Sequence, residues 1–210
     1  MMEIRLERIS KRFTSEWIFR NISQGFNLGK SYAITGPNGS GKSTLLMIIS
    51  GFMLPTEGTV EYRKEGKKID TGKVYQWIDF ATPYMELVEE LTLQEFLKFH
   101  FRFKMLSGGI SVDEMIRDMF LENDSDKCIR NFSSGMKQRL KLGLGLHSGT
   151  PVLLLDEPTS NLDDTGRKWF LARFNQVKKK KLIFMASNQP GEYEICDHYL
   201  DISEFKRTLN

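Results

Sequence analysis

Short apolar runs along the chain predict a buried β-sheet. Val152–Leu155 and Leu182–Ala186 are apolar at every position, which is typical of strands buried on both faces of a parallel sheet. Apolar residues among charged ones at positions 4 to 9 predict an edge strand instead. The other predicted strands are Ser31–Thr35, Phe26–Lys30 with a turn at Gly29, Thr59–Tyr62, and Lys73–Ile78.

Longer segments with apolar residues at helical spacing predict helices. Thr92 and Glu95 form a capping box that opens a helix running through Lys104. The other predicted helices are Ser43–Ser50, Ser111–Leu121, a stretch from Ser133 or Ser134 to beyond Leu144, and Asp164–Lys178. Strands and helices alternate in residues 1–83 and 150–210, whereas residues 84–149 are mainly helical. We therefore expect one domain with an α/β core and a helical insertion.

Composition is that of a globular protein and narrows the function classes. The 210 residues are 40% hydrophobic and 27% charged with a net charge of +3, which does not point to nucleic acid as a partner. The basic run Lys178–Lys181 is interpreted as a solvated helix end. Cys128 and Cys196 lie far apart, so we expect a reducing cytosol and no disulfide framework.

The sequence contains no candidate membrane-spanning segment. No run reaches about 18 apolar residues, and the first residues carry charges where a signal peptide would be apolar. We therefore expect any link to a membrane to come through a partner.

One nonapeptide carries a phosphate-binding motif. It follows a predicted strand and reads Gly36, Pro37, Asn38, Gly39, Ser40, Gly41, Lys42, Ser43 and Thr44. Glycines let the backbone curl so that successive N–H groups point at one anion. The helix that follows presents its positive end to the phosphates. At this spacing Lys42 reaches the β- and γ-phosphates, and the Ser43 hydroxyl is a ligand for Mg²⁺.

A second group of residues complements this loop. Asp156 stands at the carboxyl end of the predicted strand Val152–Leu155, where a carboxylate binds Mg²⁺ directly or through water. Glu157 follows at once and can accept a proton from an attacking water. The combination predicts hydrolysis of a nucleoside triphosphate.

With these motifs the chain resembles, over essentially its whole length, the ATPase subunits of ATP-binding cassette (ABC) transporters. In that resemblance Gly36–Thr44 is the Walker A loop, Val152–Asp156 is the Walker B strand, and Glu157 is the general base. The implied fold is a P-loop NTPase core, a mostly parallel sheet with flanking helices, carrying an N-terminal antiparallel β subdomain and a helical insertion.

Three further segments carry the resemblance. Phe132–Arg139 looks like the signature segment, in which Ser133 and Gly135 keep the positions that contact a γ-phosphate. Its Met-Lys-Gln-Arg form is similar to that of ABC-2-type export ATPases. Ser160–Asp163 looks like the D-loop, and its Asp163 is expected at the nucleotide. Phe13 stands where the family places an aromatic residue that stacks on adenine, with Trp17 as the weaker candidate and strand packing as the alternative role.

The resemblance implies a mechanism and partners. Two such domains, most simply two copies of this chain, face each other head to tail and bind two ATP with Mg²⁺ between them. Hydrolysis then drives a membrane permease on a separate chain, and the signature form implies export. The protein is expected in the cytoplasm, held to the inner face of the membrane by that permease. The alternative is a soluble, nucleotide-gated ABC-type switch with little hydrolysis.

Two positions depart from the family pattern. The family has a histidine after the strand that follows Walker B, and this chain has Asn188 there. An amide donates a hydrogen bond but carries no charge, so we expect slow hydrolysis. The family's Q-loop glutamine has no clear counterpart either. Gln76 and Thr82 are the two candidates, and the pattern places Gln76 within a strand.

Large apolar side chains gather at the start of the helical insertion. They occupy Tyr84–Val88 and positions 96, 99, 101 and 103, which are all phenylalanine. Two interpretations remain open from the sequence. These residues form the small core of the insertion, or they line a groove for a permease helix, because exposed apolar grooves mark partner sites.

Overall fold

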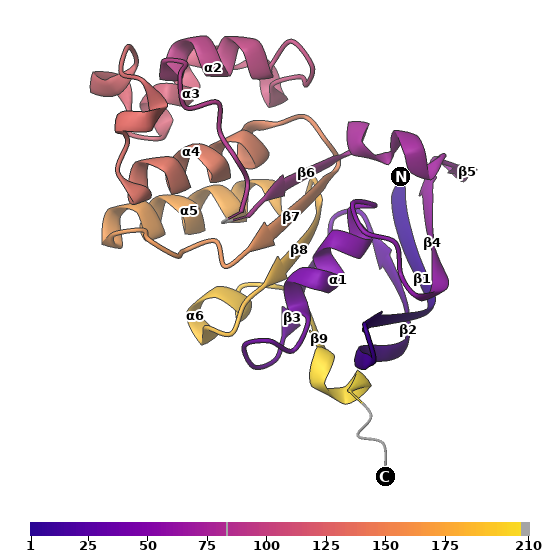
Figure 1. The fold of residues 1–210 in the computed structure, drawn as a ribbon. Helices are drawn as coiled ribbons and strands as arrows, with labels where there is room; N and C mark the ends of the chain where they lie inside the picture. The colour runs from indigo at the N-terminus through magenta and orange to yellow at the C-terminus, as the bar shows by residue number, and fades with distance from the viewer. Residues whose placement is uncertain (83, 207–210) are drawn as a thin grey trace.

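The computed structural model describes residues 1–82 and 84–206, which form two β-sheets with flanking helices (Figure 1). The larger sheet is parallel, and its strands lie in the order β6 (Ile78–Ala81), β7 (Val152–Asp156), β8 (Leu182–Ala186), β3 (Ser31–Thr35) and β9 (His198–Asp201). The smaller sheet is antiparallel, in the order β2 (Glu16–Asn27), β1 (Met2–Phe13), β4 (Glu57–Lys64) and β5 (Lys67–Lys68). The predicted α/β class is confirmed.

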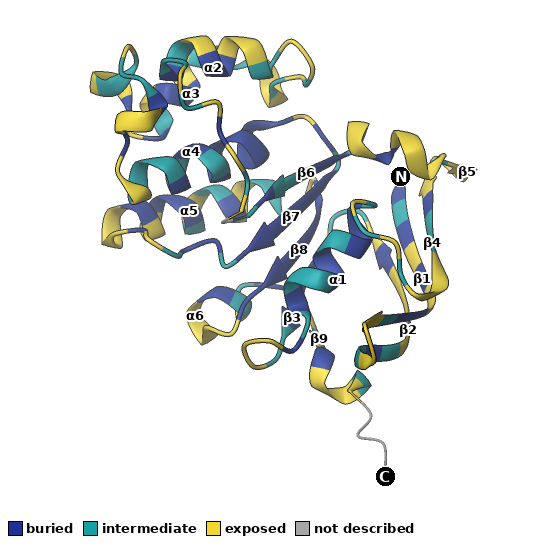
Figure 2. Ribbon diagram, in the orientation of Figure 1, coloured by how far each residue is buried: buried dark blue, intermediate teal, exposed yellow. Residues whose placement is uncertain are grey.

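The inner strands β7 and β8 of the larger sheet each contribute side chains to two different cores, one on each face of the sheet. Leu153 and Leu155 of β7 share a core with α4 (Ser134–His147) and α5 (Asp164–Val177). Leu154 shares the other core with α1 (Lys42–Ile49) and the antiparallel sheet. Every residue of β7 and β8 is buried, as Figure 2 shows. The continuous apolar runs are therefore explained by helices on one face and by α1 with the second sheet on the other.

The predicted edge strand near the N-terminus is wrong in its position within the sheet. Strand β1 pairs with β2 on one side and with β4 on the other, so it is an inner strand. Ile4, Leu6 and Ile9 are buried in the core around α1, while several of the charged residues between them are exposed. The alternation reflects one buried and one solvated face of an antiparallel sheet, which is independent of whether a strand lies at its edge.

The segment before β6 also differs from its prediction. Residues Thr71–Gln76 form the 3₁₀ helix η1, and the strand begins only at Ile78. The Asp70 side chain accepts a hydrogen bond from the Gly72 N–H at 3.0 Å, which caps this turn. Such local side-chain bonds stabilise turns at the expense of extended backbone, and only Val74 of η1 is buried.

The helical part contains α2 (Leu93–His100) and α3 (Val112–Asp118) in addition to α4, and it lies to one side of the larger sheet in Figure 1. The predicted capping box at Thr92 is present at the start of α2, and the structure adds a second one at Ser111 for α3. The first helix ends at His100 rather than at Lys104. The Lys104 ammonium instead donates to the Ile78 carbonyl oxygen at 2.7 Å and pairs with Asp79 at the start of β6.

Lys181 corrects the interpretation of the basic run as fully solvated. Its side chain is only 4% exposed, and its ammonium donates to the carbonyl oxygens of Ser148 at 2.7 Å and Thr150 at 2.6 Å. Burial lowers the pKa of Lys181 to about 8.

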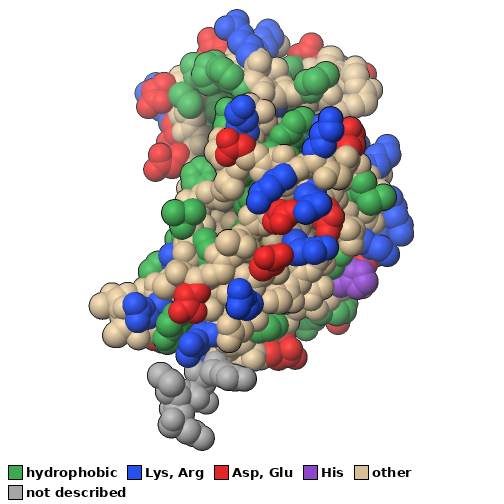
Figure 3. Space-filling model, turned by 90° about the vertical axis from the view of Figure 1, so that its right-hand side faces the viewer, with side chains coloured by type: hydrophobic (Ala, Val, Ile, Leu, Met, Phe, Trp, Pro, Cys, Tyr) green, Lys and Arg blue, Asp and Glu red, His purple; other side chains and the backbone are tan. Residues whose placement is uncertain are grey.

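The surface of the molecule mixes charges of both signs. Lysine, arginine and carboxylate side chains are interspersed on the face that Figure 3 shows. Within residues 1–82 and 84–206, no helix is long and apolar enough to cross a membrane.

Candidate nucleotide site

The phosphate loop lies between the carboxyl end of β3 and the first turn of α1. Gly36, Gly39 and Gly41 have φ values of 138°, 75° and 105°, a region that glycine adopts without steric cost. A Cβ at Gly41 would lie 2.3 Å from Ile18 Cγ2, so a side chain there would collide with β2. The left-handed φ of Gly41 and its close approach to Ile18 therefore each require glycine at this position.

Lys42 is the buried cation of this loop. Its side chain is 6% exposed, and its ammonium donates to the carbonyl oxygens of Gly36 at 2.9 Å and Pro37 at 3.2 Å. Among the residues that the structure describes, no carboxylate forms an ion pair with it. A buried positive charge without a carboxylate partner favours an anionic ligand in the loop.

Ser43 and Asp156 meet at the point where α1 and β7 converge. The Asp156 carboxylate is 3% exposed and accepts a hydrogen bond from Ser43. Burial raises the pKa of Asp156, the Ser43 hydrogen bond and the Lys42 charge lower it, and the carboxylate of Glu157 raises it. A cation at this carboxylate would favour its ionised form.

These two oxygen donors fit a hard divalent cation. Mg²⁺ takes oxygen ligands and is usually held by one or two protein groups, with waters and substrate phosphates completing its coordination. The described part of the chain contains no cluster of three or more His, Cys, Asp or Glu residues able to hold a metal. The site thus suits Mg²⁺ that arrives with a nucleotide better than a permanently caged ion.

Glu157 opens into the same pocket as the phosphate loop. Its backbone is left-handed, with φ 45°, and its N–H donates to the Ala186 carbonyl oxygen at 2.9 Å. The pocket has a volume of about 370 Å³. Its lining residues are Ile18, Asn38, Gly39, Gly41, Lys42, Ser43, Thr44, Tyr84 and Glu157. The structure therefore places a carboxylate and a phosphate-binding loop on one cavity.

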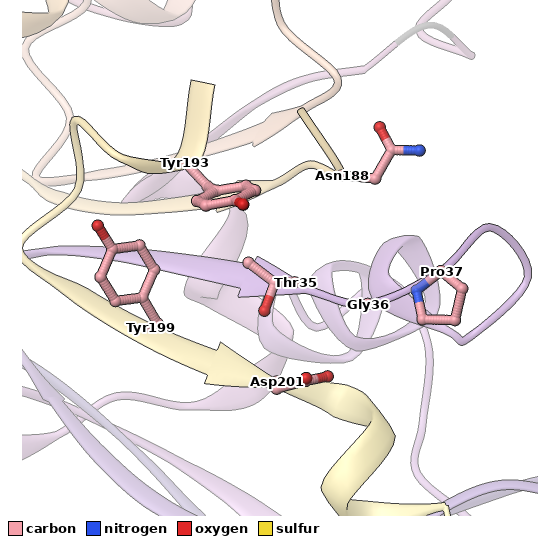
Figure 4. Close-up of a pocket in the computed structure, with 7 residues that line it drawn as sticks. All are labelled: Thr35, Gly36, Pro37, Asn188, Tyr193, Tyr199 and Asp201. Atoms are coloured by element: carbon pink, nitrogen blue, oxygen red, sulfur yellow. The ribbon is translucent and has the colours of Figure 1, made fainter. Parts of the chain in front are cut away.

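Asn188 lies against the other side of the phosphate loop. It follows β8, and its amide nitrogen donates to Asn38 Oδ1 at 2.7 Å. Asn188 also lines a larger cavity of about 510 Å³ beside the loop (Figure 4). That cavity is further lined by Thr35, Gly36, Pro37, Tyr193, Tyr199 and Asp201. Asn188 is thus positioned next to the loop through a neutral amide contact, and a contact with the γ-phosphate stays a prediction.

The two Q-loop candidates lie at opposite ends of β6. Gln76 belongs to η1, before the strand begins, and is exposed. The parallel register pairs Ala81 with Leu155, which brings Thr82 to the level of Asp156. The structure therefore separates Gln76 from the phosphate loop by the length of the strand. Thr82 Oγ1 accepts a hydrogen bond from the Tyr84 N–H at 3.3 Å.

The signature residues lie outside the pocket that Lys42 lines. Ser133 is exposed and is the N-cap of α4, its hydroxyl accepting from the Met136 N–H at 3.2 Å. This resolves the choice of helix cap between Ser133 and Ser134. Gly135 packs closely on the loop after Glu157, because a Cβ there would lie 2.9 Å from the Asn161 carbonyl oxygen.

Two other predicted contacts also lie outside that pocket. Asp163 is the N-cap of α5, where Oδ1 accepts from the Gly166 N–H at 2.8 Å. Phe13 ends β1 with 45% of its surface exposed, and the Lys11 ammonium lies 5.1 Å from its ring centroid. Trp17 lies beside the guanidinium groups of Arg12 and Arg20. Nucleotide contacts for these three remain predictions.

Sequence reasoning missed Ile18 and Tyr84 as pocket residues. Ile18 lies on β2, far from the loop in sequence, and reaches it only through sheet packing. Tyr84 is 82% exposed and follows the carboxyl end of β6, the position that could have drawn attention to it. Its ring lines both the loop pocket and a second groove next to the helical part.

The apolar cluster at the start of the insertion divides between core and surface. Leu87 and Phe96 are buried in the core that includes α4. Phe99 and Phe103 are 48% and 75% exposed and stack edge to face on each other. The core interpretation therefore holds for Leu87 and Phe96, whereas a permease groove remains a prediction for the exposed side chains.

Fold and site together define a P-loop nucleotide-binding domain. A protein-family model described as ABC transporter matches residues 19–160. Because this match covers most of the chain, the chain belongs to the ABC transporter family, as an ATP-binding domain.

The comparisons give relatives in sequence and in structure. The chain is 33% identical over 196 residues to the uncharacterised ABC transporter ATP-binding protein YxlF of Bacillus subtilis, covering 91% of this chain and 65% of that protein. It is 27% identical over 191 residues to the lantibiotic transport ATP-binding protein SrtF of Streptococcus pyogenes, covering 88% and 79%. A solved ATP-binding cassette, dimeric in a post-hydrolysis state with ADP and phosphate, aligns with a TM-score of 0.81 at 23% identity over 97% of both chains.

The extent of these matches varies with the length of the relatives. The chain spans 20% of an Arabidopsis thaliana A-family ABC transporter and 22% of one from Dictyostelium discoideum, at 30% and 28% identity. The shared unit in these long proteins is therefore the ATP-binding domain.

Proposed function

We propose that this chain binds and hydrolyses ATP as the nucleotide-binding subunit of an ABC exporter. It acts as a homodimer around two ATP, drives a permease on a separate chain, and stays in the cytoplasm at the inner face of the membrane. The single observation that carries the ATPase role is the pocket that joins Lys42 and Ser43 to Glu157. The family membership supports nucleotide use, and the name of SrtF supports export.

The predicted site residues divide the proposed reaction among them. Lys42 and the loop N–H groups bind the β- and γ-phosphates. Ser43 and Asp156 would hold Mg²⁺, which neutralises charge on the phosphate oxygens. The Glu157 carboxylate orients a water and accepts its proton as that water attacks the γ-phosphorus. The bond from this phosphorus to the β–γ bridging oxygen breaks, and ADP and phosphate leave. The signature residues Ser133 and Gly135 close the site from the second copy.

Asn188 makes the proposed reaction slow. It lies at the phosphate loop through a neutral amide, whereas a protonated histidine would add a positive charge to its hydrogen bond with the γ-phosphate. We therefore expect Asn188→His to raise turnover roughly tenfold, which corresponds to about 1.4 kcal/mol.

ATP turnover of the purified chain tests the enzyme role. Wild type is measured beside Glu157→Gln and Asn188→His, with Gln189→His as the control for a histidine added one position away, and with size-exclusion chromatography in ATP and Mg²⁺. We expect slow turnover, a loss of at least about 100-fold in Glu157→Gln, and an ATP-dependent dimer. Binding without turnover in every variant would instead favour the nucleotide-gated switch.

The permease is proposed to dock at the groove beside Tyr84. This groove has a volume of about 360 Å³ and is lined by Tyr84–Leu87, Glu89, Lys137 and Lys141. It combines apolar walls with the Glu89–Lys137 ion pair at its edge. It also shares Tyr84 with the phosphate-loop pocket, which gives a direct path from nucleotide to partner.

Co-purification with a multi-span membrane protein encoded beside this chain tests the groove. We expect Met85→Asp to abolish the complex and to leave ATP binding intact. Phe120→Asp changes another apolar residue of the helical part, 51% exposed, and is the matched control. Equal loss with both variants, or loss of the fold in Met85→Asp, would contradict the docking site.

A further inference from the structure

The loop after Glu157 is held by a buried carboxylate from α6 (Pro190–Tyr193). Glu192 is 2% exposed, and its Oε1 accepts the Thr159 N–H at 2.8 Å and also the Thr159 hydroxyl. Its Oε2 is buried and has no hydrogen-bond partner among the residues that the structure describes. Burying a charge is unfavourable unless it is well hydrogen-bonded. We therefore expect the Glu192 carboxylate to have a role other than filling space in the core.

The same loop is held from its other side by α4. Gln138 is 6% exposed, and its amide nitrogen donates to the Pro158 carbonyl oxygen at 2.9 Å. Consecutive residues of the loop, Pro158 and Thr159, are therefore fixed by two side chains from two different elements. Gly135 adds a close backbone approach to Asn161.

The backbone of this loop needs such support. Glu157 and Asn161 have φ values of 45° and 62°, in the left-handed region that residues other than glycine rarely adopt. Conformations of this kind persist where the surroundings over-determine them. The contacts of Gln138 and Glu192 lie between these two strained residues in sequence.

The two holding side chains come from elements with other proposed roles. Glu192 lies four residues after Asn188, which contacts the phosphate loop. Gln138 lies on the helix that Ser133 caps. One short loop thus connects the signature helix, the segment after β8 and the proposed general base.

We propose that Glu192 and Gln138 are positioning residues that fix the Glu157–Asn161 backbone, and with it the direction in which the Glu157 carboxylate enters the pocket. This inference rests on the proposed ATPase function. The two residues transmit a shift of either α4 or α6 to Glu157. Neither residue touches the nucleotide pocket, so nucleotide affinity does not depend on them.

Turnover and nucleotide binding are measured separately to test this. We expect Glu192→Ala to lower kcat by about 100-fold, the effect of a catalytic group misplaced by about 1 Å, with the Kd for ATP changed less than about threefold. Glu192→Gln keeps an acceptor for Thr159, and its neutral bonds are weaker, so its kcat should fall about tenfold. Glu194→Ala removes an exposed carboxylate from the end of the same helix and is the matched control.

Amide hydrogen exchange at Thr159 gives a readout that does not depend on activity. Its N–H is the donor to Glu192, so we expect its exchange to accelerate at least about tenfold in Glu192→Ala and Glu192→Gln. It should stay unchanged in Glu194→Ala. Thr159→Val removes only the hydroxyl contact and should reproduce part of the kcat loss, which keeps the test valid if Glu192→Ala fails to fold.

A double-mutant cycle joins the two positioning residues. Combining Gln138→Ala with Glu192→Gln should lower kcat by less than the product of the single effects, because both anchor one loop. Unchanged Thr159 exchange in the Glu192 variants, or faster exchange with unchanged kcat, would overturn the proposal. Absence of turnover in wild type would refute the ATPase function. The exchange rate of the Thr159 N–H would then still show whether Glu192 holds this loop.

Discussion

The phosphate loop and the signature segment differ in how much of their surroundings this one chain provides. Lys42 is buried, fixed by two carbonyl oxygens, and shares a pocket with Glu157. Ser133 is exposed and Gly135 is half-buried, and neither lines that pocket. One chain therefore builds one half of the proposed ATP site in full and presents the other half on its surface. In the proposed dimer, the first half binds ATP and carries the general base, and turnover also requires the second half.

The largest loss of function is expected from a change in the phosphate loop, the half of the site that one chain builds in full. Lys42→Met keeps the length of the side chain and removes its charge, so ATP affinity should fall at least about 100-fold. Isothermal titration with ATP and Mg²⁺ measures it, and circular dichroism checks the fold. Lys30→Met, an exposed lysine before β3, is the control and should bind as wild type does. Equal affinity in Lys42→Met and wild type would remove the distinction between the two halves.

In the signature segment, the half at the surface, we expect a substitution to lower turnover and to leave ATP affinity unchanged. Ser133→Asp retains a good N-cap for α4 and places a negative charge where the proposed partner presents a γ-phosphate. Turnover should fall about 100-fold, while ATP affinity of the isolated chain stays within about twofold. The same change at the N-cap of α3, Ser111→Asp, controls for the substitution itself. If Ser133→Asp weakens the binding of ATP to the single chain, Ser133 acts on the nucleotide of its own chain, and the proposed division into two halves is wrong.

The two halves also differ in how far sequence could predict them. The phosphate loop follows from one stretch in which glycine spacing, strand and helix are consecutive, and the structure places β3 at the predicted residues Ser31–Thr35. The same holds for β7, whose apolar run ends in Asp156. Local constraints of this kind leave few alternatives.

Residues that depend on packing between distant segments could not be predicted. Glu192 reaches Thr159 across 33 positions, and Ile18 enters the phosphate-loop pocket from β2. The residues around Gln76 have the composition of a strand, whereas the Asp70 cap starts a 3₁₀ helix there. The sequence shows Tyr84 only as part of an apolar segment, and the fold brings it to the loop pocket.

Away from the site, Lys181 predicts a pH dependence of stability. Burial lowers its pKa to about 8 in the folded protein, from a value of 10.5 when solvated. Between these values the unfolded chain binds more protons, so the free energy of unfolding should rise with pH. The rise from pH 8 to 10 should be about 2 kcal/mol, since one pKa unit corresponds to about 1.4 kcal/mol.

Urea unfolding of wild type and Lys181→Met across this pH range isolates the effect of this lysine. The variant should lack the rise, and Lys180→Met, an exposed neighbour, should retain it. Parallel pH profiles in all three proteins would show that Lys181 keeps an ordinary pKa in the folded state.

The smallest expected effect concerns Asp163, which belongs to the loop between the two halves. Its side chain caps α5 through the Gly166 N–H, so Asp163→Ala should lower stability by about 1 kcal/mol. Asp163→Asn preserves the cap and removes the charge, so its free energy of unfolding should equal that of wild type. Turnover of this second variant separates the two roles. Wild-type turnover in Asp163→Asn would assign the residue to the helix alone, whereas a loss at full stability would place its carboxylate in the reaction, next to the loop that Glu192 and Gln138 hold.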